Sequence, residues 1–374
     1  MEDKIFADCR FFSGEKPCSF HKEQGVKCSD CEYYSPVGER ILIIKMGAMG
    51  DVLRTTCILT GLKEKHPDSY VTWVVEKGSG DLLHNIESID RIMEFSLETV
   101  VMLQAEKFDL VLSLDSSVLS ASIAERMNGD EKIGFGLSKG GKVSPFSPEA
   151  EEWFRMGVFD DVKRKNKRTY QEVIFEIVGI STKDHEIIVN LTDEEKKFAK
   201  VFSKENGMDN CSSPVIGLNT GAGGRWLLKK WTREGYLELI RKLHEKIGAR
   251  ILLFGAGGEK ERNQWLVEKS TCSVIDTGSE NSLREFFALL DLCNIVVAGD
   301  TLAVHAALGL QKEVVVLFGP TSPYEIELYG RGERVIAPVD CICCYRENCD
   351  RKPSCMDLIT VKSVSDAVLR LLRR

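Results

Sequence analysis

The sequence predicts an α/β protein made of two doubly wound, Rossmann-like halves that face each other. The chain has 374 residues, which is comfortable for two domains of roughly 100–200 residues each. Short apolar runs alternate with helical patterns through both halves, and this alternation is typical of βαβ units with a parallel sheet. Glycine turns follow several predicted strands, and ligands of such folds bind at the carboxyl ends of the strands.

Residues 1–38 differ in composition from the rest of the chain. They are rich in Cys and punctuated by Gly, Ser and Pro, with little apolar periodicity, so we expect a small appended module. An apolar run then opens the first half, followed by a glycine turn, Asp51 and a helical pattern. The predicted elements of this half are strands at 41–44, 71–75 and 110–114 and a helix from 51 to about 65.

The second half repeats this order of elements. A polar stretch at 190–213 predicts a helix and a linker before it. The predicted elements that follow are strands at 215–218, 250–254, 294–298 and 314–318 and helices at 233–247, 283–290 and 363–374.

Composition and charge narrow the class of function. The chain is 43% hydrophobic and 29% charged, which is typical of a globular protein. Its net charge of −7 gives no overall basic field, so we expect no nucleic-acid partner. No apolar run approaches the ~18 residues of a membrane-spanning helix, and the first residues do not resemble a signal peptide. We therefore expect a cytoplasmic protein.

Asp51 is the first candidate functional residue. It follows Gly47-x-x-Gly50 at the mouth of the first strand. There it either acts as a helix N-terminal charge that the helix dipole stabilises, or accepts a proton from a bound hydroxyl; the sequence leaves both interpretations open. The turn lacks the third glycine of a dinucleotide fingerprint, which disfavours an NAD-dependent oxidoreductase.

Two segments of the second half are typical of anion binding. Lys229 and Lys230 follow a glycine-rich strand end, where backbone N–H groups and an exposed lysine would hold a phosphate; the alternative is a solvated pair of lysines. The segment 299–301, Gly-Asp-Thr, opens a helix whose first-turn N–H groups are free to bind an anion. His305 on that helix is either a ligand or an ordinary buried histidine.

From about Arg40 onward, the chain resembles glycosyltransferase family 9, the lipopolysaccharide heptosyltransferases. The matching segments are Ile41-Leu42-Ile43-Ile44-Lys45 with Gly47-x-x-Gly50-Asp51-Val52-Leu53, Lys229-Lys230-Trp231, Gly299-Asp300-Thr301-x-x-x-His305-x-Ala307 and Leu317-Phe318-Gly319-Pro320-Thr321. The resemblance implies a GT-B fold with the active site between the two halves, and an inverting transfer from a nucleotide sugar that needs no cofactor or metal.

The resemblance also implies a role for each matching residue. Asp51 matches the catalytic base, Lys229 a donor-phosphate ligand and Glu259 a ribose-contacting glutamate. The implied donor-binding residues are Thr220, Gly221, Lys229, Glu259, Asp300, Thr301 and His305. Leu302 and Thr232 stand where the family usually has glycine and proline. These departures bear on the identity of the transferred sugar more than on the type of reaction.

The implied donor is ADP-L-glycero-D-manno-heptose, and the implied acceptor is the lipid A/Kdo/heptose region of a lipopolysaccharide core or a related anionic glycan. Peripheral contact with the cytoplasmic face of the inner membrane fits such an acceptor, and the basic run 163–168 is a candidate surface. Transfer from another nucleotide sugar is one alternative. A non-catalytic sugar-nucleotide-binding or assembly protein with metal modules is another.

The predicted domains follow from these roles. They are a Cys-rich metal-binding module at 1–38, an N-terminal Rossmann-like acceptor domain at 39–200, a C-terminal Rossmann-like nucleotide-sugar-binding domain at 201–340, and a Cys-rich tail with a helix at 341–374.

Nine of the thirteen cysteines lie in two clusters near the ends of the chain. In a reducing compartment clustered thiolates indicate metal sites, and Cys28-x-x-Cys31 has the spacing at which two ligands share one metal. The predicted ligands are Cys9, Cys18, Cys28 and Cys31, with Cys341, Cys344, Cys349 and Cys355 forming a second site or completing the first. We expect structural zinc, with iron or an iron–sulfur cluster as one alternative. Buried thiols that bind no metal are the other alternative.

Overall fold

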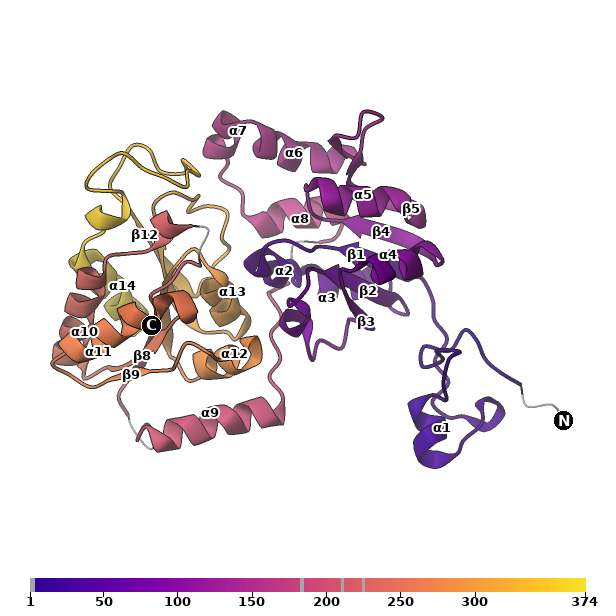
Figure 1. Cartoon of the computed structure of the whole chain (residues 1–374), viewed down its shortest axis with the longest axis horizontal. Helices are drawn as coiled ribbons and strands as arrows, with labels where there is room; N and C mark the ends of the chain where they lie inside the picture. Colours follow the sequence, from indigo (N-terminus) through magenta and orange to yellow (C-terminus); the bar gives the residue numbers. More distant parts are fainter. Residues whose placement is uncertain (1–3, 182–184, 210–211, 224–225) are drawn as a thin grey trace.

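A computed structural model describes residues 4–181, 185–209, 212–223 and 226–374. Two six-stranded sheets, each covered by helices, form the two halves, and a small module carrying α1 projects from the first (Figure 1). The predicted α/β fold class is confirmed. Within the described residues, no helix has the length and apolar character needed to cross a bilayer.

Both sheets have the strand order 3-2-1-4-5-6, which is typical of dinucleotide-binding folds. The first sheet runs β3-β2-β1-β4-β5-β6 and is parallel except for the β5–β6 pair, and the second runs β12-β11-β10-β7-β8-β9 and is parallel throughout. In each sheet the strand order reverses between two neighbouring strands, the first and the fourth of that half in chain order. The carboxyl ends of these two strands form the edge of a crevice, where ligands of such folds bind. These edges are the β1/β4 and β7/β10 ends.

The strands of the first sheet are β1 Arg40–Ile44, β2 Tyr70–Val75, β3 Arg91–Glu94, β4 Lys107–Ser113, β5 Asn128–Leu137 and β6 Val143–Pro145. Those of the second are β7 Val215–Asn219, β8 Arg250–Phe254, β9 Val274–Asp276, β10 Ile295–Gly299, β11 Glu313–Phe318 and β12 Gly332–Ile336. Apart from Arg40, which is half-buried, the central strands β1 and β10 are apolar on both faces and buried, as expected for parallel strands covered by helices.

The helices of the module and first half are α1 Ser19–Gln24, α2 Met49–Thr55, α3 Ile58–Lys65, α4 Leu97–Gln104, α5 Val118–Arg126, α6 Glu151–Val158, α7 Asp160–Lys165 and α8 Tyr170–Val178. The remaining helices are α9 Asp193–Glu205, α10 Arg233–Ile247, α11 Lys260–Lys269, α12 Leu283–Asp291, α13 Leu302–Gly309 and α14 Val361–Leu371. The expected domain boundary at residue 200 falls inside α9.

The helix predicted from 51 to about 65 is two helices, α2 and α3. The chain breaks at Thr56, whose backbone N–H and hydroxyl both donate to the carbonyl of Leu53, at 3.1 and 2.7 Å. Threonine hydroxyls compete in this way with the helical hydrogen-bond ladder. The expectation of one continuous helix was therefore wrong at this point.

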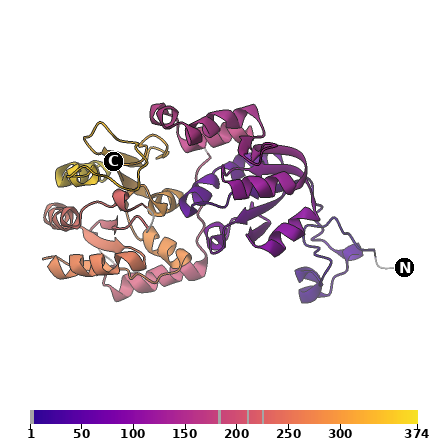
Figure 2. The same ribbon diagram turned by 45° about the horizontal axis from the view of Figure 1, so that its top comes forward.

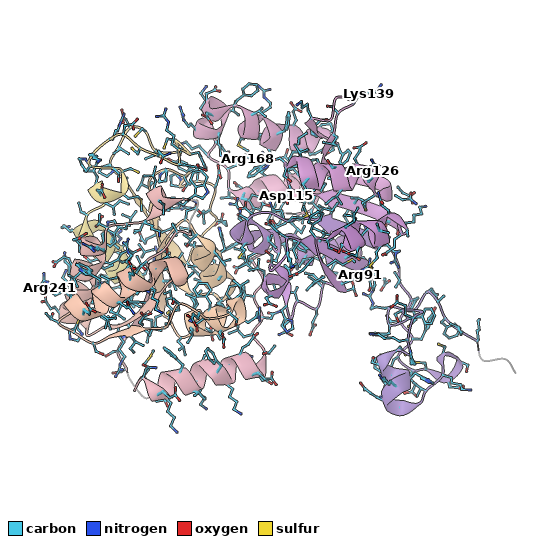
Figure 3. All side chains as sticks on the ribbon, in the orientation of Figure 1. Arg91, Asp115, Arg126, Lys139, Arg168 and Arg241 are labelled. Carbon is cyan, nitrogen blue, oxygen red and sulfur yellow. The ribbon has the colours of Figure 1, made fainter. Side chains whose placement is uncertain are left out.

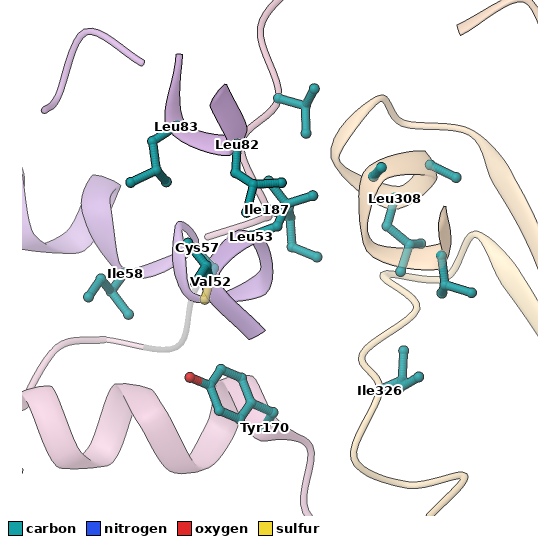
Figure 4. Close-up of a cluster of buried hydrophobic side chains, with 14 of the residues drawn as sticks. Val52, Leu53, Cys57, Ile58, Leu82, Leu83, Tyr170, Ile187, Leu308 and Ile326 are labelled. Carbon is teal, nitrogen blue, oxygen red and sulfur yellow. The ribbon is translucent and has the colours of Figure 1, made fainter. Parts of the chain in front are cut away.

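The two halves share one hydrophobic cluster, which holds α2 against α13. Val52 and Leu53 of α2 belong to it together with Leu308 of α13 (Figure 4). The backbone N–H of Tyr170 donates to the carbonyl of Glu325 at 2.9 Å, which ties α8 to the second half. The two crevice edges are thereby brought face to face.

The basic run 163–168 also bridges the halves. The ammonium groups of Lys163 and Lys167 lie 3.7 and 3.6 Å from the ring centroids of Tyr345 and Tyr324. The other basic residues form ion pairs, Arg164 with Asp160, Lys165 with Asp161, and Arg168 with Glu152 and Glu176. Figure 2 shows α7 reaching over toward the C-terminal segment. All five charges thus have intramolecular partners.

Candidate active site

The loop after β1 is held by a carboxylate from the neighbouring strand. Asp115, labelled in Figure 3, follows β4 and is 7% exposed. It pairs with the ammonium of Lys45 and accepts a hydrogen bond from the backbone N–H of Gly47 at 3.0 Å. Burial by itself would lower the pKa of Lys45, but the charge of Asp115 opposes this. The pKa of Lys45 is therefore raised above its ordinary value, and Lys45 stays protonated. This pair fixes the turn that presents Asp51.

Asp51 lies in the first turn of α2, with 37% of its side chain exposed. Its Oδ1 accepts from Nη2 of Arg54 at 2.9 Å, and Arg54 is almost completely buried. The guanidinium of Arg54 lies 3.8 Å from the ring centroid of Tyr170. Burial raises the pKa of Asp51, but the charges of Arg54 and Lys45 lower it below the ordinary value. The carboxylate is therefore ionised at neutral pH.

Lys229 and Asp300 form an ion pair at the opposite edge. Nζ of Lys229 donates to Oδ2 of Asp300 at 2.9 Å and to its carbonyl oxygen at 3.0 Å, and both side chains are largely buried. A Cβ at Gly299 would lie 2.7 Å from the Lys229 carbonyl oxygen, so this approach requires glycine. Burial raises the pKa of Asp300, but Lys229 and its surroundings lower it to about 2.

His305 connects the two edges. It is 4% exposed on α13, and a Cβ at Gly50 would lie 3.0 Å from its Cδ2, so the glycine turn of α2 packs directly on the imidazole. Burial and the charge of Arg54 lower the pKa of His305 to about 4, which keeps the ring neutral at pH 7. Among the described residues, its Nδ1 is buried and has no hydrogen-bond partner.

A second group of predicted residues lies beside the first. Lys230 donates to Oε1 of Glu259 at 2.6 Å, and Glu259 is only 4% exposed. A Cβ at Gly221 would lie 2.5 Å from the Glu259 carboxyl carbon. Thr220 is fully buried and donates to Asn263 at 2.6 Å. This Lys230–Glu259 group stands near the carboxyl ends of β7 and β8.

Asn219 joins these two groups. Its Nδ2 donates to the Gly221 carbonyl at 3.1 Å and to Oγ1 of Thr301 at 3.3 Å. The structure thus brings together every residue predicted for catalysis and donor binding. Gly224, the last residue of the glycine-rich strand end, and Arg225 after it lie outside the described residues. Sequence reasoning missed Arg54, Tyr170 and Asn219 as parts of this site, although Asn219 directly follows the strand predicted at 215–218.

The two cysteine clusters lie apart. Cys9, Cys18, Cys28 and Cys31 line one cavity, and Cys341, Cys344, Cys349 and Cys355 line another. Figure 1 shows the module with α1 and the C-terminal segment at opposite ends of the molecule, so the two clusters do not complete one site. Across the described ranges, no three His, Cys, Asp or Glu side chains are arranged as a metal-binding group. Metal binding stays a prediction.

We expect Arg54→Met to raise the pKa of Asp51, because burial then acts with less opposing charge. A base must be ionised to work, so the acidic limb of the pH profile of kcat/KM should move to higher pH. Arg54→Lys, which keeps the charge, should leave this limb close to that of the wild type. If the limbs of Arg54→Met and wild type coincide, Arg54 does not control the base.

Comparison with known proteins points to one family. A family model described as glycosyltransferase family 9 (heptosyltransferase) matches residues 99–354. The lipopolysaccharide core heptosyltransferase OpsX of Haemophilus influenzae is 22% identical over 349 residues, which cover 86% of this chain and 90% of that protein.

Solved structures agree on the fold. A family 9 glycosyltransferase of Veillonella parvula has a TM-score of 0.74 at 17% identity, with 90% of this chain and 97% of that one covered. The ADP-heptose lipopolysaccharide heptosyltransferase II of Escherichia coli has a TM-score of 0.65 at 17% identity, with 89% and 98% covered. These likenesses confirm the expected arrangement of two Rossmann-like halves.

Proposed function

The chain belongs to glycosyltransferase family 9, and we propose that it transfers heptose from ADP-heptose to a saccharide of a lipopolysaccharide core. The observation that carries this proposal is the pairing of opposite chemistries across the two edges. The first half presents an ionised carboxylate, Asp51. The second presents a lysine, Lys229, at the N-terminal end of α13.

The proposed reaction is a single displacement. As the glycosidic bond breaks, the diphosphate gains negative charge, which Lys229 and the first-turn N–H groups of α13 would stabilise. Asp51 would take the proton of the acceptor hydroxyl from the opposite side of the sugar, giving inversion. Its low pKa makes it a weak base, so proton transfer would come late in the attack. We propose that no metal ion takes part in this transfer.

In the proposed donor site, the negative charge of Asp300 offsets the positive charge of Lys229. Asp300 would repel a diphosphate placed beside it, so the lysine must offset both the carboxylate and the ligand. The free N–H groups at the start of α13 supply the remaining positive potential. The unpartnered Nδ1 of His305 offers a further hydrogen bond to the donor.

For the acceptor, we propose a lipopolysaccharide core, the molecule that the names of the relatives print, in the form of anionic lipid A that carries Kdo. The basic run 163–168 contributes less than its charge suggests, because each of its charges has a partner within the chain. The described cysteines are all free thiols, which supports a cytoplasmic location. Peripheral contact with the inner membrane would bring the enzyme to this acceptor.

The test is ADP release from ADP-heptose in the presence of Kdo-bearing lipid A, compared with GDP- and UDP-sugars. Of the three kinds of donor, we expect only ADP-heptose to be turned over. The Asp51→Asn enzyme should show no more than a residual rate with it. Turnover with a GDP- or UDP-sugar only would replace the donor. Donor binding without any turnover would favour the alternative of a non-catalytic binding protein.

A further inference from the structure

The module that precedes the first half, residues 4–37, has no hydrophobic core. None of its side chains is buried. Several of its large apolar and aromatic side chains are exposed, whereas Phe6 and Phe20 are half-buried. The exposed ones are Ile5 at 65%, Phe11 at 41%, Phe12 at 37%, Tyr33 at 40% and Tyr34 at 38%. Chains below roughly 40 residues usually need disulfides, metals or oligomerisation to fold.

The rest of the protein gives this module little support. Figures 1 and 2 show it projecting from the first half, away from both sheets. Arg10 makes the described contacts with the first half, an ion pair with Asp90 and hydrogen bonds to the carbonyls of Asp68 and Ser69 at 3.2 and 3.1 Å. Arg10 and Asp90 are 21% and 8% exposed, so this pair anchors the module at one point. Arg10 does not line the cavity that the cysteines share, so the pair does not hold the cysteine segments together.

The module is nevertheless ordered. It contains α1, a short 3-10 turn at Cys28–Asp30 and a β-bridge between Cys9 and Pro36. The rings of Phe20 and Tyr33 stack with their centroids 4.0 Å apart. Something other than a core must therefore fix the relative positions of these pieces.

Its four cysteines converge from three separate segments. Cys9, Cys18, Cys28 and Cys31 all line one cavity of about 370 Å³, and all four are free, partly buried thiols. The backbone N–H of Cys31 donates to the carbonyl of Cys28 at 3.4 Å, which closes the turn of the Cys-x-x-Cys segment. Such a turn presents two sulfurs to one ion.

The charges around this cavity suit a metal–thiolate centre. Lys4, Lys16 and Lys27 line it, and no Asp or Glu is among its described lining residues. Four thiolates around a divalent ion carry a net charge of about −2, which these lysines would offset. The absence of carboxylates from this lining disfavours calcium and magnesium, which need oxygen ligands, whereas thiolates select zinc or iron.

We propose that Cys9, Cys18, Cys28 and Cys31 bind one tetrahedral zinc ion, which takes the place of a hydrophobic core in the module. The described side chains do not already form a metal-binding group, so the four thiols must turn inward into the cavity that they share. His21 also lines the cavity, and its Nδ1 is held 2.9 Å from the Val26 carbonyl oxygen, which leaves Nε2 as a reserve ligand.

The C-terminal cluster provides the matched control. There Cys355 packs against the hydrophobic cluster of the second half, and the adjacent Met356 is 2% exposed. This end of the C-terminal segment therefore packs on a hydrophobic core, which the N-terminal module lacks. Cys341→Ser/Cys344→Ser makes the same chemical change as Cys28→Ser/Cys31→Ser at a place where we expect no effect on the module.

The experiment measures metal content and cobalt binding in the full chain. Purified wild type should contain one zinc per module, and Co²⁺ added after chelation should give thiolate-to-cobalt charge-transfer bands. Cys28→Ser/Cys31→Ser should lose both, and limited proteolysis should then cleave within residues 4–37 while the two Rossmann-like halves stay intact. Cys341→Ser/Cys344→Ser should keep the bands and the protected module.

Two results would overturn the proposal. One is a wild-type chain that gives no cobalt–thiolate bands although its module resists proteolysis after chelation. The other is loss of the bands in Cys341→Ser/Cys344→Ser with retention in Cys28→Ser/Cys31→Ser, which would move the site to the C-terminal cluster. If the wild type contains iron in place of zinc and Cys28→Ser/Cys31→Ser loses that iron, the proposed site is supported and only the identity of the metal changes.

Discussion

Asp51→Asn should lower turnover by roughly 10²–10⁴-fold, the usual contribution of a general base, while the donor still binds. The substitution is nearly isosteric, and an amide oxygen can still accept from Nη2 of Arg54, which lies 2.9 Å from Oδ1 in the native pair. The residues proposed to bind the donor lie on the other half of the protein. ADP-heptose affinity, measured by calorimetry, should therefore stay near that of the wild type.

Asp193→Asn is the control for this change. Its side chain is 99% exposed on α9, so the same loss of charge there should leave turnover unaltered. Thermal unfolding should show a modest loss of stability for Asp51→Asn, because buried Arg54 loses its ionic partner. An Asp51→Asn enzyme that keeps more than half of the wild-type rate would remove Asp51 from the mechanism.

Lys229→Ala should weaken ADP-heptose binding by roughly 10- to 100-fold, as expected for loss of a charge-assisted contact. The sequence suggested an exposed lysine, and this was wrong for Lys229. Lys229 is 14% exposed and paired with a largely buried carboxylate, so Lys229→Ala should also lower the midpoint of thermal unfolding.

A double variant separates these two effects. Lys229→Ala/Asp300→Asn removes both charges, so it should regain much of the stability lost in Lys229→Ala without regaining donor affinity. In the wild type, the pKa of Asp300 is about 2, below its ordinary value near 4. The stabilisation from this pair is thus complete above about pH 4 and lost as the pH falls toward 2.

Lys230→Ala tests the alignment through the glycine turn. Lys230 pairs with Glu259 rather than with Asp300, so its loss should act on the nucleoside end of the donor. If Lys230→Ala abolishes affinity for inorganic diphosphate and Lys229→Ala leaves it intact, the assignment of the phosphate ligand is off by one residue.

The elements of the two sheets could largely be predicted because their signals are local. Continuous apolar runs such as 41–44 and 314–318 predicted buried parallel strands, and both are strands in the structure. Short or partly exposed strands carried no such signal: β3 alternates between exposed and half-buried residues and β9 has three residues, and neither was expected.

For the candidate site, the positions of the residues along the chain could be predicted, but their contacts could not. Asp51, Asp300 and His305 could be chosen from the sequence because each stands at or soon after the carboxyl end of a strand, next to glycine-containing turns. Their contacts could not, because these join residues far apart in the chain. Lys229 meets Asp300 across 71 positions, and the Thr55 hydroxyl next to Arg54 meets that of Tyr170 across 115.

The sequence by itself thus determined the two doubly wound halves, the position of each candidate residue along its strand or helix, and the clustering of the cysteines. Only the tertiary structure decided that Arg54 pairs with Asp51, that Lys229 is buried against Asp300, and that the two cysteine clusters lie apart. Periodicity and turn residues act between near neighbours in the chain, whereas pKa values and ion pairing depend on burial and on distances between charges, which only the packing of the two halves sets.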